Sequence, residues 1–148
     1  GARKLNFNLQ ARAVYSTDFS SIDHRGYVFN PKLNYTREHV TGLDLKVFTS
    51  MGPIFATEKL MDYFYQVDPE FVTSTRPAYD ADAGYLGSNM TLGVSKRFNS
   101  RFRLMLGTRL GIHSGATNDD SPLFKDELNV SVFSAFIWSF YQSEELAR

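Results

Sequence analysis

Cysteine is absent from the 148-residue chain, which excludes disulfides, thiolate metal sites and cysteine nucleophiles. The chain also lacks any run of the ~20 apolar residues that a transmembrane helix requires. Net charge is zero, because 16 basic residues balance 16 acidic ones. This balance argues against nucleic-acid binding, which usually needs a basic excess. No apolar export leader with a small-residue cleavage site is visible, so we expect any leader to lie outside these residues.

Aromatic residues, in contrast, make up 15% of the chain, and they fall within stretches of alternating polarity. In "KLNFNLQARAVY" (residues 4–15), Leu5, Phe7 and Leu9 alternate with asparagine and glutamine. Only a β-strand places residues i, i+2 and i+4 on one face. The stretch therefore predicts a strand with one apolar and one polar face.

Five further stretches show the same period and predict strands: "GYVFNPKLNYTR" (26–37), "LDLKVFTSM" (43–51), "SNMTLGVSKRF" (88–98), "RFRLMLGTRLGIH" (101–113) and "ELNVSVFSAFIWSFY" (127–141). Segments of about 9–15 residues exceed the ~5–6 residues of ordinary strands. They suffice to cross a bilayer when tilted, which takes ~9–11 residues. Strand length therefore favours a membrane setting.

The connections between these strands alternate in length: medium, short, very long (loop 52–84), very short and long (loop 113–126). Transmembrane barrels have tight turns on the periplasmic side and long loops outside. Aromatic residues near the strand ends fit the girdles of such barrels: Tyr15, Tyr27, Tyr35, Trp138 and Phe140. We predict an all-β fold, an antiparallel outer-membrane β-barrel forming a single domain over residues 1–148.

About six strands are present, and membrane barrels need at least ~8. An open edge in lipid would leave backbone groups unpaired, so we expect these strands to be part of a larger barrel. The alternative is a soluble ligand-binding β-barrel whose apolar face is its core. Association of several copies of the chain into an oligomer is a further alternative.

Several motifs resemble the MipA/OmpV family of outer-membrane proteins, in which MipA is the MltA-interacting protein. They are "YFYQV", "RPAYDADAGY", "SPLFKD" before the final aromatic strand, and the earlier "GYVFNPKLNY". Their order and spacing carry the resemblance, which covers essentially all 148 residues and corresponds to the C-terminal part of a longer family member.

The resemblance implies a location in the bacterial outer membrane and a non-enzymatic role. MipA-like members are described as scaffolds that join a lytic murein transglycosylase to a penicillin-binding protein, and OmpV-like members are linked to adhesion and osmotic response. The implied partners are therefore outer-membrane lipid and these two peptidoglycan-remodelling enzymes. A small-solute pore is the alternative function.

Four arginines lie on or near one predicted hairpin: Arg97, Arg101, Arg103 and Arg109. They are candidate lumen charges. Pairing with acidic residues such as Asp44 would make them structural filling, which is the favoured reading, while unpaired arginines would give a small pore anion selectivity.

The longest loop carries a cluster of aromatic residues outside the strands: Tyr63, Phe64, Tyr65 and Phe71. Such a cluster is either packed as a plug over the barrel mouth, which we favour, or presented to a partner.

No catalytic residue, cofactor or metal site is predicted. His113 and Ser114 are adjacent in a strand and therefore point to opposite faces, which prevents them from acting as base and nucleophile. Asn118, Asp119 and Asp120 offer oxygen ligands but lack the spacing of a calcium loop, so a solvated turn is expected there.

Overall fold

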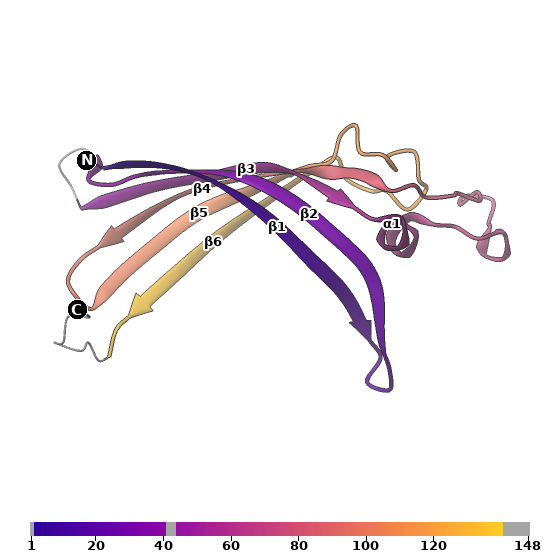
Figure 1. Ribbon diagram of the computed structural model, residues 1–148, viewed down its shortest axis with the longest axis horizontal. Helices are drawn as coiled ribbons and strands as arrows, with labels where there is room; N and C mark the ends of the chain where they lie inside the picture. The colour runs from indigo at the N-terminus through magenta and orange to yellow at the C-terminus, as the bar shows by residue number, and fades with distance from the viewer. Residues whose placement is uncertain (1, 41–43, 141–148) are drawn as a thin grey trace.

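The computed structural model describes residues 2–40 and 44–140 and shows one sheet of six strands in chain order, each antiparallel to the next (Figure 1). The strands are β1 (Arg3–Thr17), β2 (Ile22–Arg37), β3 (Leu45–Ala56), β4 (Gly84–Arg97), β5 (Phe102–Ile112) and β6 (Leu128–Trp138). A helix α1 (Glu58–Tyr65) and a 3₁₀ turn η2 (Pro69–Phe71) lie between β3 and β4. The predicted all-β class and six antiparallel strands are confirmed. Two predicted strand ends, Leu43 and Tyr141, lie outside the described residues.

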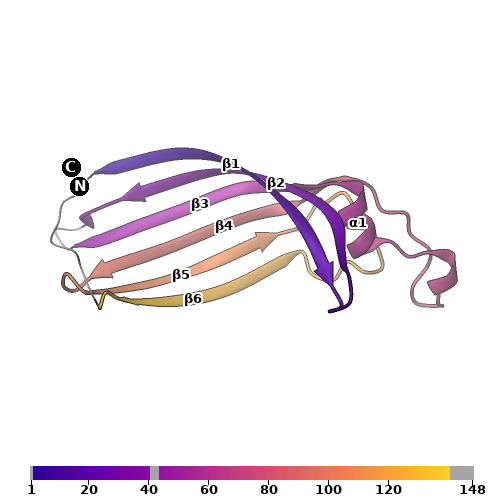
Figure 2. The ribbon, with the colours of Figure 1, turned by 60° about the horizontal axis from the view of Figure 1, so that its bottom comes forward.

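The sheet is bent into an arch (Figures 1 and 2). Within the described residues, β1 pairs only with β2 and β6 only with β5, so the arch has two edges. The start of β1, the end of β6 and the β4–β5 turn lie at one end of the sheet, which we call the turn end. Helix α1 and the β5–β6 connection lie at the other, the loop end.

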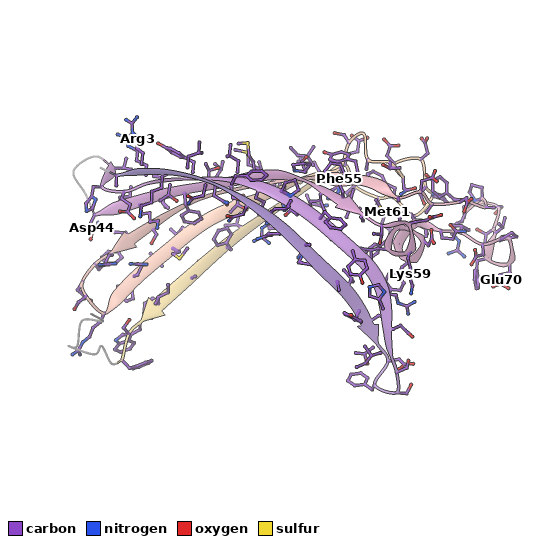
Figure 3. The ribbon with its side chains drawn as sticks, in the orientation of Figure 1. Arg3, Asp44, Phe55, Lys59, Met61 and Glu70 are labelled. Carbon is purple, nitrogen blue, oxygen red and sulfur yellow. The ribbon has the colours of Figure 1, made fainter. Side chains whose placement is uncertain are left out.

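The two faces of the sheet differ in chemistry. Arg3 lies on the convex side in Figure 3, so alternation places Leu5 and Phe7 on the same side. The cross-strand register continues this face through Phe7, Leu33, Met51, Met90 and Leu110. The opposite, concave face carries the row Asn6, Asn34, Ser50, Thr91, Arg109 and Ser131. The convex face is therefore apolar and the concave face polar.

Four strands extend beyond the predicted stretches: β1 at both ends, β2 and β4 at their starts, and β3 at its end. β2 begins at Ile22, so residues 18–21 form a tight turn instead of the expected medium connection. The β1–β2 register shifts between Val14 and Tyr15, because β2 carries one extra residue there: Val14 pairs with Gly26, whose φ of 136° suits glycine, and Tyr15 pairs with His24. β3 runs through Pro53 to Ala56, so the long connection is shorter than the predicted loop 52–84.

Prolines are tolerated inside β2 and β3 because they face each other. The β2–β3 ladder pairs Phe29 with Phe55 and Leu33 with Met51 but shows no pairs between, where Pro31 and Pro53 lie. Each proline lacks the backbone N–H that a ladder hydrogen bond needs. Because both prolines lie in the same gap, the missing donors do not interrupt the β2–β3 ladder at a second place. Asn30 spans the gap, because its Nδ2 donates to the Pro53 carbonyl over 2.6 Å.

Small residues on the concave face receive aromatic rings from neighbouring strands. A side chain at Gly93 would collide with the ring of Phe48, and one at Gly107 with the ring of Phe133. In both cases the ring lies over the glycine with which its residue is paired in the cross-strand register. This packing fills the concave face with apolar area where the strands carry no side chain.

The compact core lies at the loop end, where α1 packs on the concave face. Leu60 and Met61 of the helix are fully buried against Val28, Ala56 and Ala81. The helix therefore covers one end of the concave face, as Figure 3 shows for Met61. No helix within residues 2–40 and 44–140 is long and apolar enough to cross a membrane.

Candidate functional site

Most charged residues within the strands are basic. Asp23 is the only acidic residue within the six strands that the structure describes. Alternation and register place most of the strands' basic side chains on the concave face: Lys4, Arg12, Lys32, Lys46, Arg97, Arg103 and Arg109. The acidic residues lie mainly in the connections. The concave face is therefore a basic wall, and it contains the candidate site.

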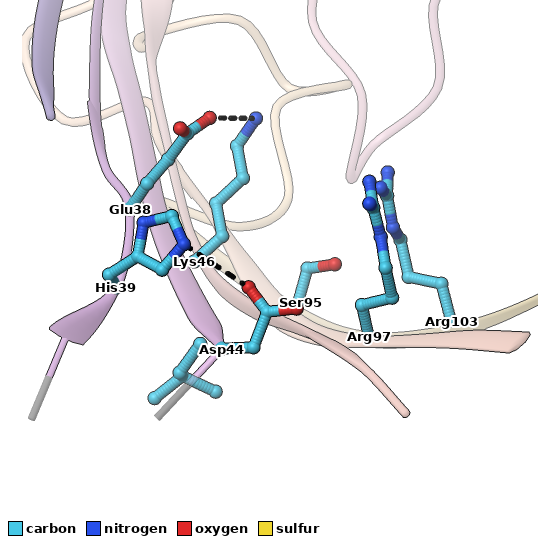
Figure 4. A pocket seen from close by; sticks show the side chains of 8 residues that line it. Glu38, His39, Asp44, Lys46, Ser95, Arg97 and Arg103 are labelled. Atoms are coloured by element: carbon cyan, nitrogen blue, oxygen red, sulfur yellow. Dashed lines mark ion pairs between the residues drawn. The ribbon is translucent and has the colours of Figure 1, made fainter. Parts of the chain in front are cut away.

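At the turn end of this wall, Arg97 of β4 and Arg103 of β5 are register partners. The strands reverse between them in the turn 98–101, where Asn99 Oδ1 accepts bonds from the N–H groups of Arg101 (2.9 Å) and Phe102 (2.8 Å). Both arginines line a pocket of about 310 Å³ together with the buried Ser95. The other residues that line it are Glu38, His39, Asp44, Leu45 and Lys46. Figure 4 shows their side chains extending alongside each other.

The acidic residues of this pocket lie beside other basic side chains. Glu38 Oε1 lies 3.7 Å from Lys46 Nζ, and Asp44 Oδ1 lies 3.6 Å from His39 Nε2 (Figure 4). The expected pairing of the arginines with Asp44 is therefore not seen. Within the described part of the chain, neither Arg97 nor Arg103 has an ion pair or a side-chain hydrogen bond.

The other two predicted arginines lie apart from this pair. Arg101 is in the turn and lines a neighbouring pocket with Ser100 and Phe102, and Arg97 and Arg103 border that pocket as well. Arg109 lies six residues along β5 from Arg103, roughly 20 Å away at the rise of an extended strand. The structure thus brings Arg97 and Arg103 together, with Arg101 beside them and Arg109 at a distance.

The predicted aromatic cluster is divided between two environments. Tyr65 is partly buried, and its ring centroid lies 6.3 Å from that of Phe124. Tyr63, Phe64 and Phe71 remain 51%, 46% and 57% exposed. The guanidinium of Arg25 lies 4.5 Å from the centre of the Tyr63 ring. The residues that fill the concave face are instead Leu60 and Met61, which the sequence pattern did not single out.

Asn118 joins the two long connections into one cap over residues 57–83 and 113–127. It is 1% exposed, and its Oδ1 accepts bonds from Tyr79 Oη (3.2 Å) and the Asp82 N–H (3.0 Å). Its Nδ2 donates to the Asp82 carbonyl over 2.8 Å. Ser121 adds a bond from its hydroxyl to the Tyr65 carbonyl at 2.8 Å. The prediction of a solvated turn is therefore wrong for Asn118, because its side-chain amide is buried and forms hydrogen bonds with backbone groups distant in sequence.

The cap is acidic, in contrast to the basic wall. Burial raises the pKa of Asp62, and the neighbouring carboxylates of Asp80, Asp68 and Asp82 raise it further. Burial also raises the pKa of Tyr79, with Asp120, Asp82 and Asp119 adding to the effect.

The residues the structure describes contain no group of three or more histidine or carboxylate ligands placed to hold a metal. His113 Nδ1 lies 2.8 Å from the Leu86 carbonyl, which anchors that ring to β4.

The sheet and its two faces define the class of protein first: an all-β protein built on one curved antiparallel sheet in which each strand neighbours the next along the chain. Comparison with protein families then shows that a family model described as MltA-interacting protein MipA matches residues 1–140. The chain belongs to this MipA family, so the predicted resemblance is confirmed. The family description names an interaction and not a reaction. No curated protein and no solved structure matches the chain.

Proposed function

We infer that the chain forms part of the wall of an outer-membrane β-barrel, with its convex face in lipid and its basic concave face toward the lumen. The observation that carries this proposal is the sidedness of the sheet. Large apolar side chains of the convex face are exposed on the edge strands and on the central ones: Leu5, Phe7, Leu9, Leu33, Met51, Leu92, Leu106, Val130, Val132 and Phe136. Such a continuous apolar surface requires an apolar neighbour.

Strand length and connection length support the same arrangement. The strands have 11 to 16 residues, enough to cross a bilayer when tilted. The two long connections form the folded cap at the loop end, where the tight turn 18–21 also lies, and the tight turn at 98–101 occupies the turn end. In outer-membrane barrels short turns face the periplasm and long loops face outward. Arg97 and Arg103 would then lie at the periplasmic end of the lumen.

The role we propose is a non-enzymatic scaffold for peptidoglycan-remodelling enzymes. The family description supports a lytic transglycosylase, MltA, as partner. A penicillin-binding protein is the second proposed partner, by the resemblance noted above. The turn end would meet these enzymes, because peptidoglycan lies on the periplasmic side. The cap at the loop end would serve adhesion or an osmotic response.

The lipid contact is tested by placing the same charge on either face of β6. Val132, which is 84% exposed on the convex face, is replaced by arginine. Asn129, which is exposed on the concave face opposite Gly111, is replaced in the same way as control, because its register partner carries no charge. An arginine on the lipid face near mid-membrane costs ~2–4 kcal/mol, while a lumen substitution is tolerated. We expect Val132→Arg to reduce the membrane-inserted fraction strongly and Asn129→Arg to leave it unchanged. Equal insertion of both variants would contradict the proposal.

The partner is tested by crosslinking the intact protein in cell envelopes and identifying what is captured. Recovery of a lytic transglycosylase with a penicillin-binding protein supports the scaffold. Absence of both under efficient crosslinking contradicts it. A conductance step in planar bilayers would instead assign a small-solute pore, and a stable monomer without detergent would assign a soluble barrel.

A further inference from the structure

We propose that Arg97, Arg103 and Ser95 form a binding site for one oxyanion, a phosphate or carboxylate group, at the turn end of the concave face. The site goes beyond the scaffold function and does not depend on which protein partner is present. It is built from neighbouring positions of a single hairpin, so its geometry is set by the β4–β5 register.

The first argument is electrostatic. Like charges directly opposite each other on neighbouring strands are destabilising. Arg97 and Arg103 occupy such positions, and the turn at Asn99 holds the two strands in this register. A guanidinium stays charged at any physiological pH, so the repulsion cannot be relieved by losing a proton. An anion between the two side chains converts the repulsion into two attractions.

The second argument concerns the nearby acids. Glu38 and Asp44 are the carboxylates that line the pocket, and they lie beside Lys46 and His39. Those ion pairs occupy one side of the pocket, and the arginines occupy the other (Figure 4). The pocket therefore presents two cations without a carboxylate partner among the described residues.

The third argument is the ligand chemistry that this arrangement selects. Each guanidinium presents a planar fork of N–H donors that matches the oxygens of a phosphate or carboxylate group. Ser95 lies two residues before Arg97 on the same face of β4, and its hydroxyl can donate a further bond. The pocket volume of about 310 Å³ lies at the lower end of ligand pockets, which suits one small acidic group.

The experiment uses the intact protein in phosphate-free detergent micelles and isothermal titration calorimetry. Inorganic phosphate and glutarate are titrated separately, so the two arms distinguish a phosphate from a carboxylate ligand. We expect saturable binding of at least one probe by the wild-type protein. Arg97→Gln and Arg103→Gln are each expected to weaken that binding at least tenfold, because each removes one fork.

Arg101→Gln is the matched control, because it removes the same charge from the adjacent turn and is expected to change affinity less than twofold. Arg103→Lys keeps the charge without the fork and is expected to weaken binding at least threefold. Ser95→Ala, a milder change that preserves the hairpin, is expected to weaken binding two- to fivefold. The proposal is overturned if neither probe binds, if Arg101→Gln weakens binding as much as Arg97→Gln, or if Arg103→Lys binds like wild type.

Discussion

Single polar residues hold the cap together. Asn118 contributes three hydrogen bonds to groups 36 and 39 positions away in the chain. A buried amide with matched partners stabilises modestly, whereas a buried group that loses its partner costs the full desolvation penalty. At this scale, Asn118 contributes to the stability of the loop end, although composition and periodicity gave no reason to expect its burial.

Replacing Asn118 with alanine is therefore expected to destabilise the intact protein by about 1–3 kcal/mol, because the Asp82 N–H and carbonyl lose their partner at a partly buried position. Chemical denaturation followed by tryptophan fluorescence measures the change. Asn129→Ala is the control, since that asparagine is exposed on β6, and a change below about 0.5 kcal/mol is expected there. Equal losses for the two variants would contradict the role given to Asn118.

Elements of the cap differ in how they are held against the sheet. Helix α1 has only two turns, which is too short to be stable by itself. Its buried residues Leu60 and Met61 attach it to β2 and β3, while its aromatic residues Tyr63 and Phe64 remain largely exposed. The helix therefore depends on two apolar contacts for its position.

Met61→Ala is expected to cost about 2–4 kcal/mol, because it leaves a cavity between α1 and the concave face. The helix should then detach from the sheet before the strands unfold. Limited proteolysis in the segment 57–83 measures this, with faster cleavage expected. Lys59→Ala on the exposed side of the same helix serves as control. If both variants are cleaved at the wild-type rate, Met61 does not anchor the helix.

Asp62 gives the cap a dependence on pH. Its pKa is raised in the folded protein, mainly by burial and then by the carboxylates of Asp80, Asp68 and Asp82, so the folded state binds this proton more tightly than the unfolded state. Ionised Asp62 therefore destabilises the cap at neutral pH. Its unfavourable contribution fades as the pH falls through the raised pKa, and it is gone below the ordinary value of 3.8.

We therefore expect Asp62→Asn to melt at a higher temperature than wild type at pH 7, with the difference shrinking towards pH 4. Thermal unfolding followed by circular dichroism at several pH values measures this. Asp126→Asn, at an exposed position of the β5–β6 connection, is the control and should show no such trend. A gain from Asp62→Asn that stays constant with pH would rule out the proposed linkage.

The whole sheet has two edges that no described strand covers. β1 and β6 each have one neighbour, and unpaired backbone groups in lipid cost several kcal/mol each. An isolated arch is thus a poor membrane structure, whereas the same arch within a closed barrel satisfies every edge. This requirement belongs to the molecule as a whole, because no single strand contains it.

We expect the 148-residue chain alone to show no heat-dependent gel mobility in detergent, and a longer chain with upstream strands to show a shift between boiled and unboiled samples. The reason is that only closed pairing of both edges resists the gel detergent at room temperature. A shift by the 148 residues alone would mean that they close by themselves or as an oligomer.

The local sequence pattern alone was enough to predict where strands occur and which of their faces is apolar. Period-2 alternation in β1, β4, β5 and β6 survives folding because one face must be apolar and the other polar wherever a sheet separates two environments. The Asn99-Ser100 turn between β4 and β5 was readable for a similar reason, since an asparagine side chain can accept bonds from backbone N–H groups two and three residues on.

Tertiary structure decided the rest. The extension of β3 through Pro53 depends on Pro31 lying opposite it, and the burial of Asn118 depends on Tyr79 and Asp82 arriving from another loop. The isolation of Arg97 and Arg103 depends on Asp44 and Glu38 lying beside other basic side chains, His39 and Lys46. Sequence alone determined which face of each strand is apolar, because alternation is a property of neighbouring residues. Only the folded chain determined which polar groups find partners, because those partners are distant in sequence and meet through register and loop packing.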